Sequence, residues 1–207
     1  MAKLHFYYSA MNAGKSTTLL QSNYNYKERG METIVFTPSI DDRYGAGIVT
    51  SRIGLKANAI SVSESMDMYL YTKEYFKKNQ NLACILVDEV HLLKHNHIKQ
   101  LTNIVDSLDI PVLAYGLRSD FRGEPFEGSM YLLILADQII ELKTICHCGK
   151  KATMNMLVDA NGQKVVAGAQ VQIGGNEKYI ATCRSHYEKG VSGIVNQKYI
   201  ASSVDKT

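Results

Sequence analysis

The stretch Ser9-Ala10-Met11-Asn12-Ala13-Gly14-Lys15-Ser16 predicts the fold of the chain around it. It follows Leu4-His5-Phe6-Tyr7-Tyr8, which has the apolar character of a short buried strand, and it precedes Thr17–Gln21, which is typical of a helix start. A strand, a loop of small residues, Gly-Lys-Ser and a helix form the context of a phosphate-binding loop. Small residues let backbone N–H groups turn inward as an anion-binding nest, and the helix N-terminus adds its positive dipole end. We therefore expect residues 9–16 to hold the phosphates of a nucleotide.

Ser9 departs from the usual pattern G-x-x-x-x-G-K-[ST], which has a glycine at this position. Serine adopts positive φ reluctantly, so the alternative is a capped helix start that happens to contain Gly-Lys-Ser. In the phosphate-binding interpretation, Lys15 reaches the β- and γ-phosphates, and the hydroxyl of Ser16 ligates Mg²⁺.

A second motif, Asn81-Leu82-Ala83-Cys84-Ile85-Leu86-Val87-Asp88-Glu89, favours the phosphate-binding interpretation. Its apolar run predicts a strand in the centre of a sheet, and an aspartate at the carboxyl end of that strand would lie near the phosphates. Asp88 is expected to hold Mg²⁺, directly or through water, and Glu89 can serve as a general base. The alternative is a strand that ends in two solvated acids at a turn.

Strands and helices alternate through the first 145 residues. A helix over 15–27 and the β-branched strand Thr33–Thr37 complete a βαβ unit, whose crossover is expected to be right-handed. The polar segment Pro38–Gly54 is either a ligand loop at the end of a strand or a solvated loop. The segment Leu117–Phe126 combines arginine with aromatic residues, which suits a nucleotide or base but also a loop packed down by its own aromatics. Further helices are expected over 63–79, 94–108 and 128–137, and further strands over 81–89, 111–116 and 138–145.

Three of the four cysteines lie in the C-terminal part of the chain. Cys146-His147-Cys148 predicts a tight turn, and Cys183-Arg184-Ser185-His186 follows it with C-x-x-H spacing. Two short pairs of soft and borderline ligands suit a tetrahedral structural zinc ion held by Cys146, Cys148, Cys183 and His186. Free thiols are the alternative, and His147 is a competing ligand. Cys84 lies in an apolar run and is expected to be a small buried side chain.

Glycines punctuate the insert Met156–Tyr179 between the two ligand pairs, which predicts a hairpin or a long flap. The expected organisation is a P-loop α/β nucleotide-binding domain over 1–145, a zinc-binding domain with this flap over 146–190, and a flexible tail over 191–207. The fold class is therefore α/β: a P-loop NTPase with a mostly parallel, RecA-like sheet flanked by helices, plus a small C-terminal zinc-binding domain.

Composition limits the classes of partner. The 207 residues are 45% hydrophobic and 21% charged, as in an ordinary soluble protein, and they carry a net charge of +3. That charge is too weak to indicate nucleic acid or an anionic membrane, and no apolar run approaches the ~18 residues of a membrane span. The N-terminus enters a strand without the layout of a signal peptide, so a cytoplasmic location is expected.

Three functional classes fit a P-loop enzyme with a zinc-stabilised appendage. In a small-molecule kinase, Glu89 would deprotonate an acceptor hydroxyl. In a nucleic-acid ATPase, Asp88-Glu89-Val90-His91 would be the D-E-x-H box of helicases, but such motors need two similar lobes and a basic surface. A non-catalytic regulator would not need a carboxylate after the magnesium aspartate. A kinase needs a pocket that excludes water, and the flap could close over an acceptor to provide it.

Several segments together resemble the thymidine kinase family, in its cytosolic type II, bacterial form. The resemblance runs from about Lys3 to Tyr187, and the combination of motifs is specific. It rests on Phe6–Ser16, Val87-Asp88-Glu89, Tyr115-Gly116-Leu117-Arg118-Ser119-Asp120-Phe121-Arg122-Gly123, the Cys-x-Cys turn, and Ile173-Gly174-Gly175-Asn176-Glu177-Lys178-Tyr179 leading into Cys183. A serine at the position of Ser9 also occurs in this family.

The resemblance implies a transferase that moves the γ-phosphate of ATP to the 5′-hydroxyl of thymidine, giving dTMP in DNA precursor salvage. It implies that Glu89 is the proton acceptor and that the flap is a lasso enclosing the base largely through backbone groups. It further implies a homotetramer inhibited by dTTP, with Mg²⁺, structural Zn²⁺ and no nucleic-acid or membrane partner. The implied residues are Ser9, Ala10, Met11, Asn12, Ala13, Gly14, Lys15, Ser16 and Asp88 for ATP; Ser16 and Asp88 for magnesium; Phe121, Gln170, Val171, Gln172, Ile173, Gly174 and Tyr179 for thymidine; and Cys146, Cys148, Cys183 and His186 for zinc.

Overall fold

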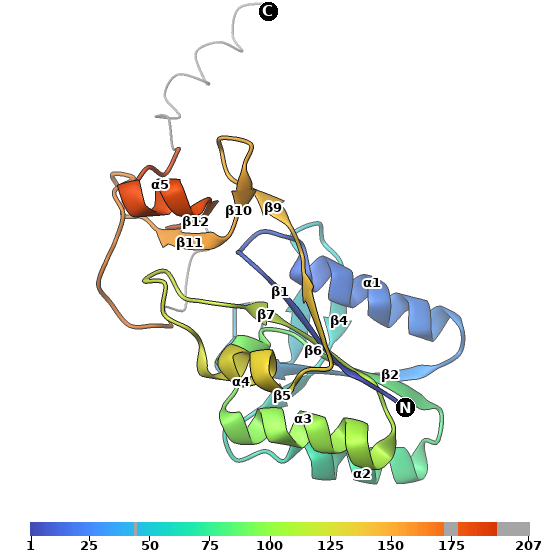
Figure 1. The fold of residues 1–207 in the computed structure, drawn as a ribbon. Coiled ribbons are helices and arrows are strands. Elements are labelled where there is room, and N and C mark those ends of the chain that lie inside the picture. Colours follow the sequence, from blue (N-terminus) through green and yellow to red (C-terminus); the bar gives the residue numbers. More distant parts are fainter. Residues whose placement is uncertain (44, 172–177, 194–207) are drawn as a thin grey trace, which may run out of the picture.

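A six-stranded parallel sheet forms the centre of the computed structural model, which describes residues 1–43, 45–171 and 178–193 (Figure 1). The strand order is β5-β2-β6-β7-β1-β8, and every pair of neighbours runs parallel. The predicted α/β fold class is confirmed. The strands are β1 (Leu4–Ser9), β2 (Glu32–Pro38), β5 (Ile60–Val62), β6 (Leu82–Val87), β7 (Val112–Leu117) and β8 (Gln138–Glu141).

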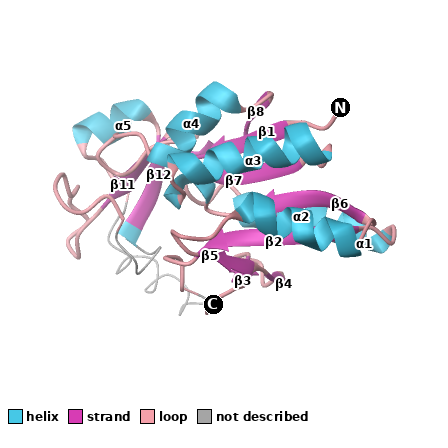
Figure 2. Ribbon diagram, turned by 90° about the horizontal axis from the view of Figure 1, so that it is seen from below, coloured by secondary structure: helices cyan, strands magenta, loops and turns pink. Residues whose placement is uncertain are grey.

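Helices cover both faces of this sheet (Figure 2). Side chains on alternating positions of the strands reach opposite layers: Phe6 and Ile85 pack with the α2, α3 and α4 side, whereas Leu86 and Tyr115 pack with α1. This double burial explains why the strands have continuous apolar runs rather than alternating polar residues. The helices are α1 (Lys15–Glu28), α2 (Met68–Lys78), α3 (His95–Leu108) and α4 (Glu127–Leu135).

Two predicted elements have different bounds in the structure. The helix expected over 63–79 begins only at Met68, because the carboxylate of Asp67 caps it by accepting a hydrogen bond from the Leu70 N–H at 2.9 Å. The strand expected over 138–145 is wrong beyond Glu141, where the main sheet ends. Thr144–Ile145 instead forms β9, which pairs antiparallel with β10 (Lys151–Ala152).

The polar segment after β2 contains structure that the sequence did not indicate. A short antiparallel hairpin forms from β3 (Ile48–Thr50) and β4 (Lys56–Asn58). Its strands are only three residues long, which is too short to show the periodicity by which a strand is recognised.

A smaller unit follows the sheet and contains the cysteine-rich segments. Its second hairpin pairs β11 (Met154–Leu157) with β12 (Tyr179–Thr182), and α5 (Arg184–Lys189) follows. The predicted flap therefore leaves from β11 and returns through β12, although its residues 172–177 lie outside the described part of the chain. Most of the tail expected to fray, 194–207, also lies outside it, and the three-part domain division stays a prediction. Among the described residues, no helix is long and apolar enough to cross a membrane.

Parallel pairing determines where the functional loops lie. Because β1, β7 and β6 are neighbours and run in one direction, the loops that follow them emerge at the same edge of the sheet. These are the loop ending at Gly14, the Ser119–Phe121 segment, and Asp88-Glu89. The loop after β2, which contains Asp41 and Arg43, joins them.

Candidate active site

The phosphate-binding loop curls around the amino group of its own lysine. Asn12 and Gly14 adopt left-handed backbone conformations, with φ of 64° and 80°. The buried Lys15 Nζ donates to Ser9 Oγ at 3.1 Å and to the Ala10 carbonyl at 3.3 Å. Burial lowers the pKa of Lys15, while Glu89 and Asp88 act in the opposite direction. A lysine folded back over loop oxygens is placed to exchange them for phosphate oxygens.

Ser9 fits its position without the freedom of glycine. It ends β1, its φ is not positive, and its hydroxyl donates to the Ala10 carbonyl at 2.6 Å. The departure from the usual glycine therefore causes no backbone strain, and the serine oxygen adds an acceptor for Lys15.

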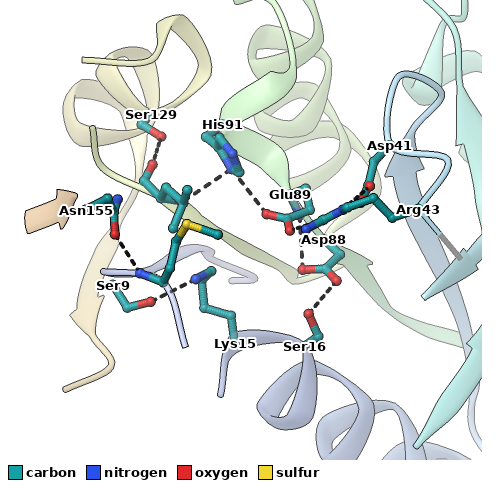
Figure 3. A network of polar contacts seen from close by, with 12 residues as sticks. Ser9, Lys15, Ser16, Asp41, Arg43, Asp88, Glu89, His91, Ser129 and Asn155 are labelled. Atoms are coloured by element: carbon teal, nitrogen blue, oxygen red, sulfur yellow. Dashed lines mark hydrogen bonds and ion pairs between the residues drawn. The ribbon is translucent and has the colours of Figure 1, made fainter. Parts of the chain in front are cut away.

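Ser16 and Asp88 lie together at the start of α1, as the sequence predicted for a magnesium pair. Ser16 Oγ donates to Asp88 Oδ2 at 2.9 Å, and Asp88 Oδ1 accepts the Glu89 N–H at 3.0 Å (Figure 3). Burial and the nearby Glu89 charge raise the pKa of Asp88 to about 7. A hydroxyl and a carboxylate are oxygen ligands of the kind Mg²⁺ prefers, and a bound cation would favour the ionised aspartate. The residues present therefore fit a magnesium ion.

Glu89 occupies a strained turn between β6 and the 3-10 helix Val90–Leu92. Its φ of 44° and ψ of 36° are left-handed, a conformation that costs of order 1–3 kcal/mol for a non-glycine residue. Its Oε1 accepts from Arg43 Nη2 at 2.5 Å, and its Oε2 lies 3.5 Å from His91 Nδ1. Arg43 also donates through Nε to Asp41 Oδ1 at 2.5 Å. Strain of this kind, held by several partners, is typical of functional sites.

The charges around Glu89 keep it ionised. Burial alone would raise its pKa, but attraction by His91, Arg43 and Lys15 outweighs burial and lowers it to about 2. Burial lowers the pKa of His91 to about 4, so its ring is neutral at neutral pH and the attraction then comes from Arg43 and Lys15. In agreement, His91 Nδ1 accepts a hydrogen bond from the Leu117 N–H at 3.2 Å, which requires an unprotonated Nδ1.

Two cavities meet at Glu89. One is lined by the phosphate-binding loop, Asp88 and the turn of the β3–β4 hairpin at Ser51–Ile53. The other combines aromatic and apolar side chains with polar ones, among them His91, Asp120 and Gln170. The residues that line both are Met11, Asp41, Arg43, Glu89 and Leu117. This arrangement allows a group held in one cavity to react with a group held in the other, next to a buried carboxylate.

The second cavity has the character of a base or nucleoside site. Phe121 is held from behind, because the hydroxyl of Tyr187 donates to its carbonyl at 2.7 Å. Its ring meets that of Tyr179 edge to face, with 6.4 Å between centroids. The buried Asp120 fixes this loop by accepting the N–H groups of Arg122 and Glu124 at 2.8 and 2.9 Å. Aromatic rings beside polar groups that can fix an orientation suit a planar heterocycle with hydrogen-bonding edges.

The structure places most of the sequence-predicted residues at these cavities. Phe121, Gln170, Val171 and Tyr179 line the second one, whereas Gln172–Gly174 lie outside the described residues. Sequence reasoning assigned no site role to Arg43, His91 or Asn155. Arg43 belongs to the polar segment Pro38–Gly54, which was a possible ligand loop, and His91 is the last residue of the D-E-x-H box. Both positions could therefore have been found from the sequence. Asn155 had none, because it is one polar residue in the short strand β11.

The four predicted zinc ligands lie together in the smaller unit. The ligand atoms of Cys146, Cys148, Cys183 and His186 all lie within 4.8 Å of one another. Cys146 Sγ is 3.3 Å from His186 Nδ1, and Cys148 Sγ is 3.9 Å from Cys183 Sγ. The competing His147 is not in this set, and its ring stacks on His186. Three sulfurs and one imidazole at these separations fit a tetrahedral Zn²⁺.

Comparison with known proteins identifies relatives along nearly the whole chain. The family model described as thymidine kinase matches residues 2–187. A thymidine kinase of Legionella pneumophila (strain Paris) is 58% identical over 193 residues, covering 93% of this chain and 92% of the relative. One from Coxiella burnetii is 54% identical over 190 residues, covering 92% and 97%. A solved structure of Pif1 helicase from Candida albicans aligns with a TM-score of 0.42 and 16% identity over 70% of this chain and 36% of that one, too little to support an argument.

We expect the purified protein to contain about one zinc ion per chain, because the Cys₃His set matches a structural site. Cys183→Ser should lower the zinc content and the melting temperature, since Cys183 packs with Ala152 and Ala181 in the small core of this unit. Metal analysis and thermal unfolding measure both effects. Cys84→Ala is the matched control, because this buried thiol lies in β6 away from the cluster. Wild-type protein without metal would contradict the assignment.

Proposed function

The chain belongs to the thymidine kinase family, and on that premise we propose how its residues divide the reaction between the two cavities. The enzyme transfers the γ-phosphate of ATP to the 5′-hydroxyl of thymidine and so forms dTMP. The observation that carries our assignment is the position of Glu89, a buried carboxylate that lines both the phosphate-loop cavity and the aromatic cavity.

ATP occupies the phosphate-loop cavity in this proposal. The backbone N–H groups of residues 9–16 and the N-terminus of α1 bind its phosphates. Lys15 releases the oxygens of Ser9 and Ala10 and pairs with the β- and γ-phosphates instead. Ser16 and Asp88 hold Mg²⁺, which neutralises charge on the β- and γ-phosphate oxygens when bound.

Thymidine occupies the aromatic cavity. Its base lies against Phe121 and Tyr179, whose rings form one wall. Gln170 and Val171 line this cavity, and the family resemblance implies that the segment Gln170–Gly174 encloses the base largely through backbone groups. Gln170 supports this arrangement, because its Nε2 donates to the Pro125 carbonyl at 3.2 Å and ties the start of the segment to the Phe121 loop. Closure excludes water, which would otherwise compete as phosphate acceptor.

Transfer then takes place in one step beside Glu89. The 5′-oxygen attacks the γ-phosphorus in line, and its proton passes to the Glu89 carboxylate. The bond between the γ-phosphorus and the oxygen that bridges the β- and γ-phosphates breaks, which leaves ADP. The low pKa of Glu89 makes it a weak base, but phosphoryl transfer needs little base strength and depends mainly on positioning and charge neutralisation. Arg43 keeps the carboxylate ionised and oriented in the free enzyme.

The nucleic-acid ATPase is not favoured. The D-E-x-H letters are present at Asp88–His91, but His91 serves to accept the Leu117 N–H and is neutral. The net charge of +3 also gives no basic track for a phosphate backbone.

We also propose that the enzyme is a cytoplasmic homotetramer inhibited by its end product dTTP, as the family resemblance implies. Exposed apolar side chains on α4 and β8, namely Leu133, Ile134 and Ile139, support an assembly surface. An inhibitor with the thymidine base and a triphosphate could engage both cavities, because they are continuous at Glu89.

The function is tested with ATP labelled at the γ-phosphate, Mg²⁺ and a panel of deoxynucleosides. We expect label in thymidine monophosphate, with slower or no transfer to purine nucleosides, because the chain belongs to the thymidine kinase family. Single-stranded DNA should not stimulate ATP consumption. ATP hydrolysis that depends on DNA, with no labelled nucleoside, would instead support the alternative.

Glu89→Gln should lower kcat by about 10²–10⁴-fold, the usual scale for loss of a general base, while ATP and thymidine still bind. Steady-state kinetics and equilibrium binding separate the two effects. Glu74→Gln is the control, because Glu74 is an exposed residue of α2 that forms an ion pair with Lys77 on its own helix. Near-normal turnover of Glu89→Gln would remove Glu89 from the proton-acceptor role.

A further inference from the structure

Asn155 is a buried polar side chain at the junction of the two units. It lies on β11 with 3% of its surface exposed, and its neighbours Met156 and Leu157 are also buried. Its Oδ1 accepts the Met11 N–H at 2.8 Å, and its Nδ2 donates to the Ser119 carbonyl at 3.0 Å. One amide therefore bonds to two backbone groups more than 30 residues away in sequence, one of them across 144 positions.

Both partners belong to loops that the proposed reaction uses. Met11 lies in the phosphate-binding loop and lines both cavities. Ser119 immediately precedes Asp120 and Phe121, which line the nucleoside cavity. Asn155 itself lies on β11, the strand from which the flap leaves. The side chain thus connects the phosphate-binding loop, the Ser119–Phe121 segment (the nucleoside loop) and the strand at which the flap begins.

We propose that Asn155 is a positioning residue that sets the distance between the bound γ-phosphate and the bound 5′-oxygen by fixing these loops to each other. The inference rests on the proposed function and deepens it. Asn155 also lines the aromatic cavity, but both of its hydrogen bonds are made to backbone groups of the two loops. Reactive alignment requires the two atoms to lie about 3–3.5 Å apart, and a displacement of 1 Å can cost about 100-fold in rate.

The two hydrogen bonds require both an acceptor and a donor on the same side chain. Met11 N–H needs an acceptor and the Ser119 carbonyl needs a donor, and an amide supplies both from one planar group. An aspartate keeps the acceptor but places a second oxygen against the Ser119 carbonyl. A leucine has nearly the same size and satisfies neither, so the Met11 N–H loses its buried acceptor.

The test compares Asn155→Leu and Asn155→Asp with the control Asn103→Leu, an exposed position on α3. We expect folded Asn155→Leu to lose about 10–100-fold in kcat, with KM values for ATP and thymidine changed by less than about 3-fold. Misaligned phosphate should also react with water, so the ratio of ADP formed to nucleotide formed should rise above one. A role in stability alone would not change that ratio. Asn103→Leu should behave as wild type.

Several outcomes would overturn the proposal. Unchanged kcat in folded Asn155→Leu would do so, as would raised KM values at normal kcat, which would make Asn155 a substrate contact. If Asn155→Leu does not fold, Asn155→Asp decides: reduced kcat with an ADP excess supports the proposal, and wild-type kinetics contradict it. A wild-type enzyme that phosphorylates no nucleoside would instead refute the proposed function.

Discussion

The parallel pairing of β1, β7 and β6 is the constraint on which the site depends. Parallel strands bring their carboxyl ends to one edge, so residues far apart in sequence meet there without any dedicated connection. The phosphate-binding loop follows β1, the nucleoside loop follows β7, and Asp88-Glu89 follows β6. β7 lies between the other two strands, so the loop that follows it emerges at the same edge, while Ser16 at the end of the phosphate loop still reaches Asp88 directly. The two cavities and their meeting point at Glu89 follow from this order.

Buried charge at that edge is balanced, and the balance prepares the site for a polyanion. Lys15 and Arg43 face Asp88 and Glu89 in a region where burial disfavours the charged form of each group. In the free enzyme the cations satisfy the carboxylates and the loop oxygens of Ser9 and Ala10. Phosphate oxygens could take the place of the loop oxygens at Lys15, and a magnesium ion could take the place of the hydrogen bond between Ser16 and Asp88. Preorganised charge of this kind is usually the largest contribution to catalysis.

The sequence predicted the central sheet and the polar chemistry because each left a local signal. Gly14-Lys15-Ser16 and Asp88-Glu89 stand directly beside apolar runs, and the zinc ligands come in short pairs. The β3–β4 hairpin and the end of β8 were missed, because such short strands show no periodicity and their pairing is tertiary. Arg43 had only a loop context, since nothing in its sequence neighbourhood indicates that it pairs with Glu89 across 46 positions. Asn155 gave no signal, because its two partners are backbone groups of distant loops.

In the proposed reaction, ATP in one cavity passes its γ-phosphate to a nucleoside in the other through a single in-line displacement. ATP made chiral at the γ-phosphorus by oxygen isotopes tests this step, because the configuration at phosphorus can be determined in the nucleotide formed. One displacement beside Glu89 predicts inversion at phosphorus. Retention would require two displacements through a phosphorylated enzyme group, and it would contradict the account.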